Sequence, residues 1–378
     1  MILSRAQFLA SLVAPLTGLA SEQVAEFSDY PPHFRTDVST GRPRVKSFDL
    51  RRLTSWQTPA DEFFTFHQGG AGAPAPADAW TLQISGSLAR PRTLTMDDLA
   101  RRPMTELAAT IECSGNNDHP TLMNGLVSNG VWTGVELGPL LRECGVLAEA
   151  REVAFFGADA ERERKWPAGD REFETPHGRS VFVQDAIDGG AILALTLNGR
   201  PLSPAQGHPL RLVVPGWYGM TQIKWLDRIV VLDRRYEGRH MARNYHSLAF
   251  SPGHPLLETS ISRMRLKSVV AQVTRQATSY LITGAAWGGL VDRVEVRVDN
   301  GPWRPAAITH RGSAHAWSLW QAPWQPASPG THTIVSRAVD VQGRIQPVSS
   351  EFASTRENNS QWVRRLRLQE MVQPGKGG

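Results

Sequence analysis

The chain has 378 residues, a length that suggests two domains, and its composition argues against several classes of protein. The 41 basic and 36 acidic side chains leave a net charge of +5, which is small and scattered and therefore does not indicate a nucleic-acid-binding protein. No apolar stretch is long enough for a membrane span. The 26 prolines, 33 glycines and 12 tryptophans favour a strand-rich fold with many turns over a helical bundle.

Residues 1–44 begin with a stretch that has the outline of an export signal. In "SRAQFLASLVAPLTGLA" one arginine precedes an apolar run with small residues, although a twin-arginine signal would need a second arginine at Ala6. We expect export to the periplasm. A short packed helix in a cytoplasmic protein is the alternative interpretation.

Strands and short helices alternate irregularly in the next part of the chain, residues 45–240. Caps and apolar spacing predict one helix over 95–103, with Thr95 as N-cap, and another over 133–147, closed by Gly145. Apolar runs predict strands over 80–88, 109–113, 152–159 and 191–199, and a pair around a glycine-rich corner in 209–232. Because there is no regular βαβ rhythm, we expect an α+β class rather than a doubly wound sheet.

The character of the chain changes after about residue 236. Residues 236–262 show no clear element and are expected to form a linker or a wrapping segment. Short strands then follow at regular spacing, which predicts an immunoglobulin-like β-sandwich for residues 241–355. The five predicted strands cover 268–274, 279–287, 291–303, 315–322 and 332–343. The last residues, 356–378, include "RRLRLQ" and are expected to form a solvated tail.

The stretch "ATIECSGNNDHP" places one of only two cysteines, Cys113, at the end of a predicted strand. A cysteine there is often a small buried hydrophobe, but the glycine of "CSGN" allows close approach of a ligand, which suits a nucleophile or a soft-metal ligand. A zinc site is excluded because no second cysteine or paired histidines lie at ligand spacing. A nucleophile would need a histidine base, for which His119 and His177 are the candidates. Cys144 lies in a predicted helix and is expected to be structural.

The motif "IECSGN", together with "GHPLRLVVPGWYGMTQIKWLDRIVV", "VWTGVELGPLL" and "AFFGAD", resembles the sulfite oxidase family of molybdopterin oxidoreductases. The resemblance runs from about residue 61 to residue 347 and includes the predicted sandwich, which is a dimerisation domain in that family. It implies a molybdenum-molybdopterin cofactor, a catalytic domain of mixed α/β structure and a homodimer.

The resemblance also implies the site residues. Cys113 matches the single protein ligand of the molybdenum and is the candidate catalytic residue, and thiolate is a suitable ligand for a metal that is already held by sulfur. Arg211 and Lys224 match contacts to the pterin phosphate, since cations bind phosphate through charge-assisted hydrogen bonds. The remaining cofactor-binding candidates are His67, Asp159, Gln206, Gln222 and Ile223.

Three positions depart from the family pattern. Phe66 stands where an arginine usually holds an oxyanion, Asp118 stands where a second arginine is expected, and Leu195 stands where a tyrosine usually faces the metal. A sulfite dianion needs compensating positive charge in a partly desolvated pocket. We therefore expect oxygen-atom transfer on a neutral sulfur or nitrogen compound, such as a sulfoxide, rather than on sulfite.

The sequence contains no CxxCH motif and no cytochrome-like region before the core, so we expect no heme and a separate electron carrier, for which a c-type cytochrome is a candidate. Two other hypotheses remain open. The missing arginines and tyrosine are also compatible with a non-catalytic electron-relay protein that keeps the cofactor, or with a scaffold whose sandwich binds another protein.

Overall fold

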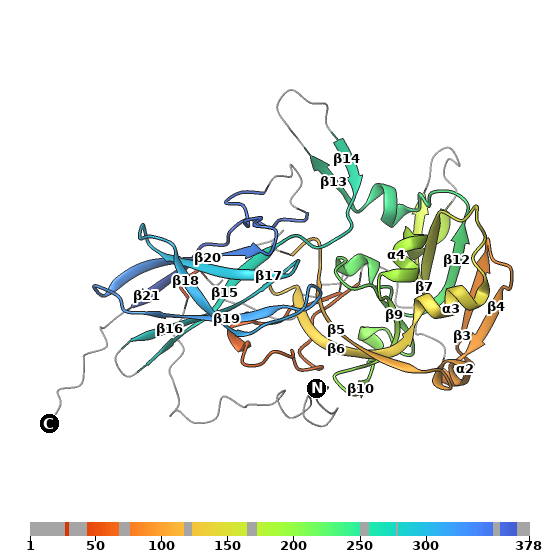
Figure 1. Ribbon diagram of the computed structural model, residues 1–378, viewed down its shortest axis with the longest axis horizontal. Helices are drawn as coiled ribbons and strands as arrows, with labels where there is room; N and C mark the ends of the chain where they lie inside the picture. The colour runs from red at the N-terminus through yellow and green to blue at the C-terminus, as the bar shows by residue number, and fades with distance from the viewer. Residues whose placement is uncertain are drawn as a thin grey trace, which may run out of the picture.

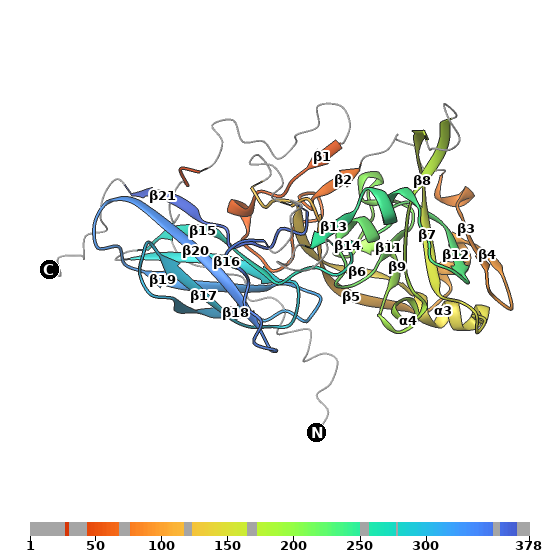
Figure 2. The ribbon, with the colours of Figure 1, turned by 90° about the horizontal axis from the view of Figure 1, so that it is seen from above.

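The computed structural model describes residues 27–29, 44–67, 76–116, 123–164, 172–249, 257–276, 279–350 and 356–368. The predicted export signal and Asp118 lie outside the described residues. Two lobes meet at a central junction, with β3, β7 and β12 in one lobe and β15 to β21 in the other (Figure 1). The same arrangement is seen from above in Figure 2. No helix in the described ranges is long and apolar enough to cross a membrane.

Two five-stranded sheets form the N-terminal lobe. The strand order of the first is β10-β9-β6-β5, with β11 also paired to β9, and that of the second is β4-β3-β12-β7-β8. The first sheet consists of β5 (Met104–Glu112), β6 (Val127–Glu136), β9 (Ile192–Leu197), β10 (Arg200–Pro201) and β11 (Arg211–Val213). The second consists of β3 (Thr81–Gly86), β4 (Arg92–Thr95), β7 (Glu152–Arg164), β8 (Glu172–Phe182) and β12 (Leu226–Leu232). Only β12 and β3 run parallel among these pairs, so the sheets are mainly antiparallel.

The α-helices of this lobe are short, and their caps agree with the sequence signals. The predicted N-cap Thr95 accepts a hydrogen bond from the Asp98 amide in a capping box, and Gly145 ends the second helix with a φ of 71°. A helix therefore forms at both predicted places, but each is shorter than predicted, because the first ends at Ala100 and residues 133–136 belong to β6. The α-helices are α2 (Met96–Ala100), α3 (Leu137–Cys144) and α4 (Val183–Asp188), and the described part of the chain is otherwise mostly β. Short 3-10 turns occur at η1 (Leu50–Arg52), η2 (Ala77–Ala79), η4 (Pro204–Gln206) and η5 (Gly219–Thr221).

The region 236–262 is more ordered than predicted. It contains a π-helical turn, η6 (Arg239–Arg243), and a hairpin of β13 (His246–Ala249) and β14 (Leu257–Ser260), so the prediction of no clear element is wrong. The hairpin projects from the junction of the two lobes (Figure 1). A second two-stranded pair, β1 (Arg44–Lys46) with β2 (Thr65–His67), lies before the first sheet in sequence. Isolated hairpins have few buried apolar residues, which explains why the pattern of this region carried no strong signal.

The C-terminal lobe is a seven-stranded antiparallel sheet in the order β15-β16-β19-β18-β17-β20-β21. It bends so that its two ends face each other, and the Ser268 hydroxyl donates to the Ser336 hydroxyl at 2.9 Å between β15 and β20. A buried apolar cluster fills the space between the facing strands. The strands are β15 (Lys267–Arg275), β16 (Tyr280–Trp287), β17 (Val291–Val298), β18 (Arg304–His310), β19 (Ser318–Trp324), β20 (Gly330–Asp340) and β21 (Arg364–Leu368).

The last strand, β21, corrects the prediction of a solvated tail. In "RRLRLQ" the residues Arg364, Leu366 and Leu368 are buried, whereas the two arginines between them are exposed, which is the alternation of a strand with one buried face. The strand pairs with β20, and the Phe27 backbone bridges to Leu366 on its other side. The sequence did not reveal this alternation because Arg364, a charged residue, occupies one of the buried positions.

Another apolar cluster joins the two lobes, and it contains residues from both. Tyr218 and Met220 come from the first lobe, whereas Val269 and Trp287 come from the second. At the same junction the Thr110 amide donates to the His315 carbonyl at 2.8 Å, and the Trp317 amide donates to the Thr110 hydroxyl at 2.8 Å. The end of β5 is therefore held by the C-terminal lobe.

Arg364 is a fully buried cation in this arrangement. Its guanidinium donates to the Asp29 carboxylate at 2.9 Å and to the Val270 carbonyl at 3.1 Å, and it lies over the Phe27 ring at 3.7 Å. Buried charges of this kind stabilise a fold only when every partner is in place. The residues near the N-terminus are thus attached to the last strand of the chain.

We expect Arg364→Met to lower the free energy of unfolding of the C-terminal lobe by about 3 kcal/mol, because it leaves the Asp29 carboxylate without its partner. Thermal unfolding of the full chain, followed by circular dichroism, measures the effect as a fall in Tm of several degrees. Arg293→Met is the matched control, since Arg293 is exposed where it pairs with Asp292 and Glu295 and should change stability by less than about 0.5 kcal/mol. Equal Tm values for the two variants would contradict the assignment.

Candidate functional site

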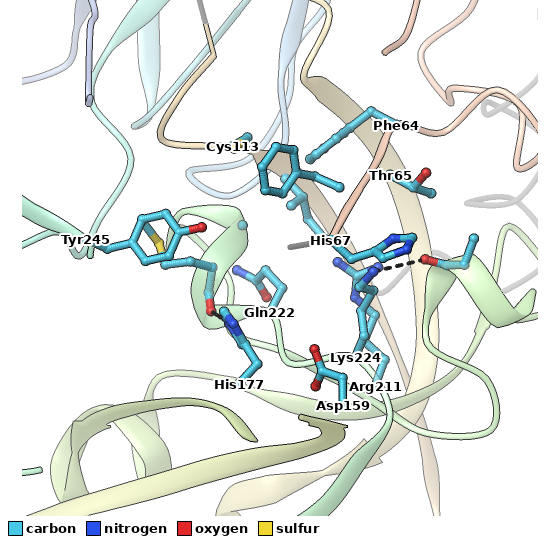
Figure 3. Close-up of a pocket in the computed structure, with 15 residues that line it drawn as sticks. Phe64, Thr65, His67, Cys113, Asp159, His177, Arg211, Gln222, Lys224 and Tyr245 are labelled. Carbon is cyan, nitrogen blue, oxygen red and sulfur yellow. Dashed lines mark hydrogen bonds between the residues drawn. The ribbon is translucent and has the colours of Figure 1, made fainter. Parts of the chain in front are cut away.

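A pocket opens on the N-terminal lobe near the junction. Figure 3 shows Cys113 and Phe64 at one end of this pocket and Asp159, Arg211 and Lys224 toward the other. Some of the side chains that line the pocket are apolar, either aromatic or aliphatic, and the others are polar or charged. The lining residues are Phe64, Thr65, Phe66, His67, Ile111, Cys113, Asp159, His177, Ala205, Arg211, Gly219, Met220, Gln222, Lys224 and Tyr245.

Cys113 directly follows β5, in a tight turn that is held by its neighbours. Its amide donates to the Leu126 carbonyl at 2.9 Å, and its carbonyl accepts from the Asn116 amide at 2.9 Å. The thiol is half-buried and is not part of a disulfide, whereas Cys144 is fully buried and burial raises the pKa of its thiol. Only Cys113 can therefore meet a ligand in the pocket.

Gly219 lets the chain approach the cysteine closely. A Cβ at this position would lie 3.2 Å from the Glu112 carbonyl oxygen and 3.6 Å from the Cys113 Cα. Even a methyl group at this position would be tight against the Glu112 carbonyl, and the backbone there would have to shift by a few tenths of an ångström. The glycine-rich corner of the predicted strand pair packs directly against Cys113.

Arg211, at the start of β11, is the most buried cation of the pocket. One guanidinium nitrogen donates to the Gln206 carbonyl at 3.0 Å, and the group lies over the Trp132 ring at 4.9 Å. Burial lowers the pKa of Arg211 to about 9. Its Nε has no hydrogen-bond partner among the described residues, an arrangement that an anionic ligand would complete.

Lys224 lies beside Arg211 and is similarly poor in partners. Its ammonium is 3.4 Å from the Ala205 carbonyl and 4.3 Å from the centre of the Trp225 ring. Burial and the nearby charge of Arg211 lower the pKa of Lys224 to about 7, and the Asp159 carboxylate acts in the opposite direction. Two desolvated cations side by side form a strong anion site.

Asp159 reaches the pocket from an irregularity in β7. The register of β7 with β8 shifts between Phe156 and Ala160, which is the effect of a β-bulge and turns a side chain out of the regular alternation. The Oδ1 of Asp159 is buried and has no hydrogen-bond partner in the described part of the chain. A carboxylate that is available in this way can accept hydrogen bonds from an N–H donor of a ligand.

The structure brings together six of the eight predicted cofactor-binding residues and leaves two behind the pocket wall. Gln206 donates from its side chain to the Ala60 carbonyl at 2.6 Å and accepts from the Ser203 amide at 3.0 Å. Ile223 is buried in the main apolar cluster of the N-terminal lobe, which includes Leu82, Leu210 and Ile229. Its carbonyl accepts from the Leu212 amide at 2.8 Å. Both residues position the lining without contributing a side chain to it.

Gln222 and His67 line the pocket from opposite sides. The Gln222 amide group binds the Val214 backbone in both directions, accepting at 2.6 Å and donating at 2.8 Å, and so fixes the loop between β11 and Lys224. His67 is at the end of β2, with its ring centre 6.0 Å from that of Trp225. The neighbouring Phe66 also lines the pocket, as the sequence comparison with the family pattern implied.

The prediction for Leu195 is wrong. Leu195 packs against the main apolar cluster and is not among the lining residues, so its identity does not determine the chemistry of the pocket. A tyrosine is present nevertheless, because Tyr245, just before β13, places its phenol in the pocket (Figure 3). Sequence reasoning missed it because it lies in the region that was expected to be a linker. The only local sign was a tyrosine among polar residues in "RNYHS", because a tyrosine combines an apolar ring with a hydroxyl that can bind a ligand.

His177 is a second residue that enters the site from outside the predicted set. It comes from β8, its Nε2 lies 2.9 Å from the Met220 carbonyl, and burial lowers its pKa. The sequence raised His177 as a base for a cysteine nucleophile, yet Figure 3 shows it beside Asp159 rather than Cys113. It therefore belongs to the cationic end of the pocket.

The residues present fit a cofactor that brings its own metal ligands. No group of three or more histidine, cysteine, aspartate or glutamate side chains in the described ranges could hold a metal ion alone. A thiol lies at one end of the pocket, and two cations with a buried carboxylate lie at the other end. This arrangement suits a chelate with a soft metal and an anionic tail.

Comparison with known proteins agrees with this interpretation. The family described as oxidoreductase molybdopterin binding domain matches residues 71–240, and the Mo-co oxidoreductase dimerisation domain matches residues 258–369. Mitochondrial sulfite oxidase of Rattus norvegicus is 30% identical over 332 residues, which are 78% of this chain and 58% of the relative. NADH nitrate reductase 2 of Phaseolus vulgaris is 29% identical over 334 residues, which are 75% of this chain and 36% of the relative. The chain thus matches at most about three fifths of the length of these two relatives.

The fold agrees with a solved structure of the same kind. The sulfane dehydrogenase SoxCD from Paracoccus pantotrophus superposes with a TM-score of 0.75 at 24% identity, covering 96% of this chain and 92% of that chain. Because the superposition covers 96% of this chain, it includes both lobes. The chain belongs to the sulfite oxidase family of molybdopterin-dependent oxidoreductases.

Proposed function

We propose that this chain is a molybdenum-dependent oxidoreductase that transfers an oxygen atom to or from a small neutral sulfur or nitrogen compound. One observation carries it: the Cys113 thiol lines the same pocket as two cations whose pKa is lowered by burial, Arg211, with an unpartnered Nε, and Lys224. The relatives act, by their names, on sulfite or nitrate, which supports a substrate among sulfur or nitrogen compounds.

Each residue has a defined part in this proposal. Cys113 would ligate the metal, Arg211 and Lys224 would bind the anionic tail of the cofactor, and Asp159 would accept from its ring N–H groups. When bound, the cofactor supplies two-electron redox chemistry. The Tyr245 phenol faces the same space and can donate a hydrogen bond to an oxygen of the substrate.

The substrate preference follows from the apolar side chains around the thiol. Phe64, Phe66, Ile111 and Met220 line the pocket, and none of them can compensate the charge of an oxyanion. Desolvating a doubly charged anion against such a surface is costly. Phe66, where the family pattern has an arginine, therefore favours a neutral substrate such as a sulfoxide.

We also propose how the chain assembles and exchanges electrons. The C-terminal lobe would be an immunoglobulin-like dimerisation domain, which the family match to residues 258–369 supports through its description. Electrons would pass to or from a separate carrier, for which a c-type cytochrome is the candidate, since these 378 residues contain no CxxCH motif for a covalent heme. Export to the periplasm rests on residues 1–44 alone.

Cys113→Ser should abolish molybdenum binding, because a hydroxyl is a poor ligand for a soft, sulfur-held metal. Protein from a cofactor-competent host should lose at least about nine tenths of its molybdenum and its thiolate-to-metal absorption, measured by inductively coupled plasma mass spectrometry and visible spectroscopy. Cys144→Ala changes the other cysteine and should keep both signals. Unchanged molybdenum in the serine variant would rule out Cys113 as the ligand.

Phe66→Arg should shift the preference toward oxyanions, because it adds the missing positive charge to the substrate end of the pocket. We expect kcat/KM for sulfite, relative to that for dimethyl sulfoxide, to rise by about tenfold, equivalent to about 1.4 kcal/mol. Steady-state assays with artificial electron dyes measure both reactions. Phe66→Leu, which adds no charge, should leave the ratio near that of the wild type, and absence of turnover with sulfite, sulfoxide and nitrate would favour the non-catalytic relay.

Binding of an anion at the cationic end should depend on pH through Lys224. With a pKa of about 7, the ammonium is largely deprotonated above that pH, so an anion can bind only if a proton is taken up and its affinity falls as the pH rises. The increase in Tm caused by sulfate should be larger at about pH 6 than at about pH 8.5.

Lys224→Arg is the matched variant, because a guanidinium stays charged over this range. Its sulfate-induced Tm increase should be nearly the same at both pH values. A wild-type increase that is independent of pH would show that Lys224 keeps an ordinary pKa in the folded protein.

A further inference from the structure

Glu112 immediately precedes Cys113 at the end of β5. Successive side chains of an extended chain point to opposite sides, so Glu112 points away from the pocket when the thiol points into it. Its carboxylate contacts the C-terminal lobe, where Lys267 of β15 donates to Oε1 at 3.0 Å and the Trp287 indole of β16 donates to Oε2 at 2.8 Å. The end of β5 lies at the junction of the two lobes (Figure 1).

The ion pair is almost completely removed from water. The exposed fraction of Glu112 is 2% and that of Lys267 is 1%. Lys267 completes its bonding with the Asn358 carbonyl at 3.0 Å, and its ammonium lies 6.0 Å from the Trp287 ring. Burying such a pair gives little net stability over well-packed apolar residues, so its value lies in the geometry that it specifies.

The same carboxylate is bonded to the turn that carries Cys113. The Asn116 side chain donates to Glu112 Oε1 at 3.0 Å and accepts from the Leu126 amide at 3.0 Å, whereas its own amide donates to the Cys113 carbonyl. A second connection comes from the Glu357 amide, which donates to the Ser114 carbonyl at 2.8 Å. Both sides of the cysteine are thus held through groups of the C-terminal lobe.

We propose that the Glu112–Lys267 pair, completed by Trp287 and Asn116, is a positioning device through which the C-terminal lobe fixes the direction of the Cys113 thiol. Glu112 and Lys267 are positioning residues, since neither lines the pocket. The role of the thiol as metal ligand rests on the proposed function, but its orientation can be measured without the metal.

The decisive experiment compares three variants of the full chain produced in a host that lacks the cofactor. Lys267→Met leaves a buried carboxylate unpaired. The double variant Glu112→Leu with Lys267→Met replaces the pair by apolar side chains and should restore much of the Tm. Arg364→Met disrupts the other buried ion pair of the same lobe, far from the cysteine turn in the hydrogen-bond network, and is the control for destabilisation alone.

The readout is the rate of alkylation of Cys113 by iodoacetamide, followed by mass spectrometry well below every Tm, with buried Cys144 as the internal reference. Both Lys267 variants should alkylate Cys113 at least about fivefold faster than the wild type, because the turn opens more often. Arg364→Met should alkylate at the wild-type rate despite its lower Tm.

In a cofactor-competent host, the double variant should also lose several-fold in molybdenum content, whereas Arg364→Met should retain it. A double variant that alkylates Cys113 at the wild-type rate or more slowly would overturn the positioning role, whatever its molybdenum content. Failure of the molybdenum assignment is tested separately by Cys113→Ser and leaves the alkylation result unaffected.

Discussion

The pocket depends on a single electrostatic constraint, the desolvation of two neighbouring cations. Arg211 and Lys224 are held by carbonyl oxygens of the segment 205–206 and by the faces of Trp132 and Trp225, which stabilise a cation less well than water does. The lowered pKa values of both groups express this cost. A fold that keeps two such groups is complementary to an anion that it does not itself contain.

The surrounding elements serve this constraint. The bulge in β7 supplies Asp159 as the nearby counter-charge, and the bonds of Gln222 to Val214 hold the loop that delivers Lys224. At the other end, Gly219 allows the same loop to pack on the cysteine turn. One short segment, between β11 and β12, therefore determines the distance between the thiol and the cations.

The sequence was sufficient to predict features that depend on neighbouring residues, such as helix caps and short motifs. Caps predicted two of the three described α-helices, and the family motifs led to six lining residues. The wrong or missing predictions have another cause. The direction in which a side chain points depends on what packs on each face of its strand, and the local sequence does not give this. Leu195 lies in β9, which is covered on both faces, so alternation could not show its direction. Arg364 lies in a core position that a charge conceals, and Tyr245 reaches the pocket only through tertiary packing.

The pocket and the C-terminal lobe cannot be treated as independent units. Met220 and Tyr245 line the pocket and also belong to the apolar cluster that includes Val269 and Trp287 of the C-terminal lobe. Trp287 in turn donates to Glu112, the neighbour of Cys113, so the same indole contributes to the packing of the pocket wall and to the position of the thiol. A shift of the C-terminal lobe would move apolar wall and sulfur together, because close-packed interiors transmit displacement rather than absorb it. None of the strands β15 to β21 contributes a lining residue, yet the C-terminal lobe helps to determine the shape of the pocket through these contacts.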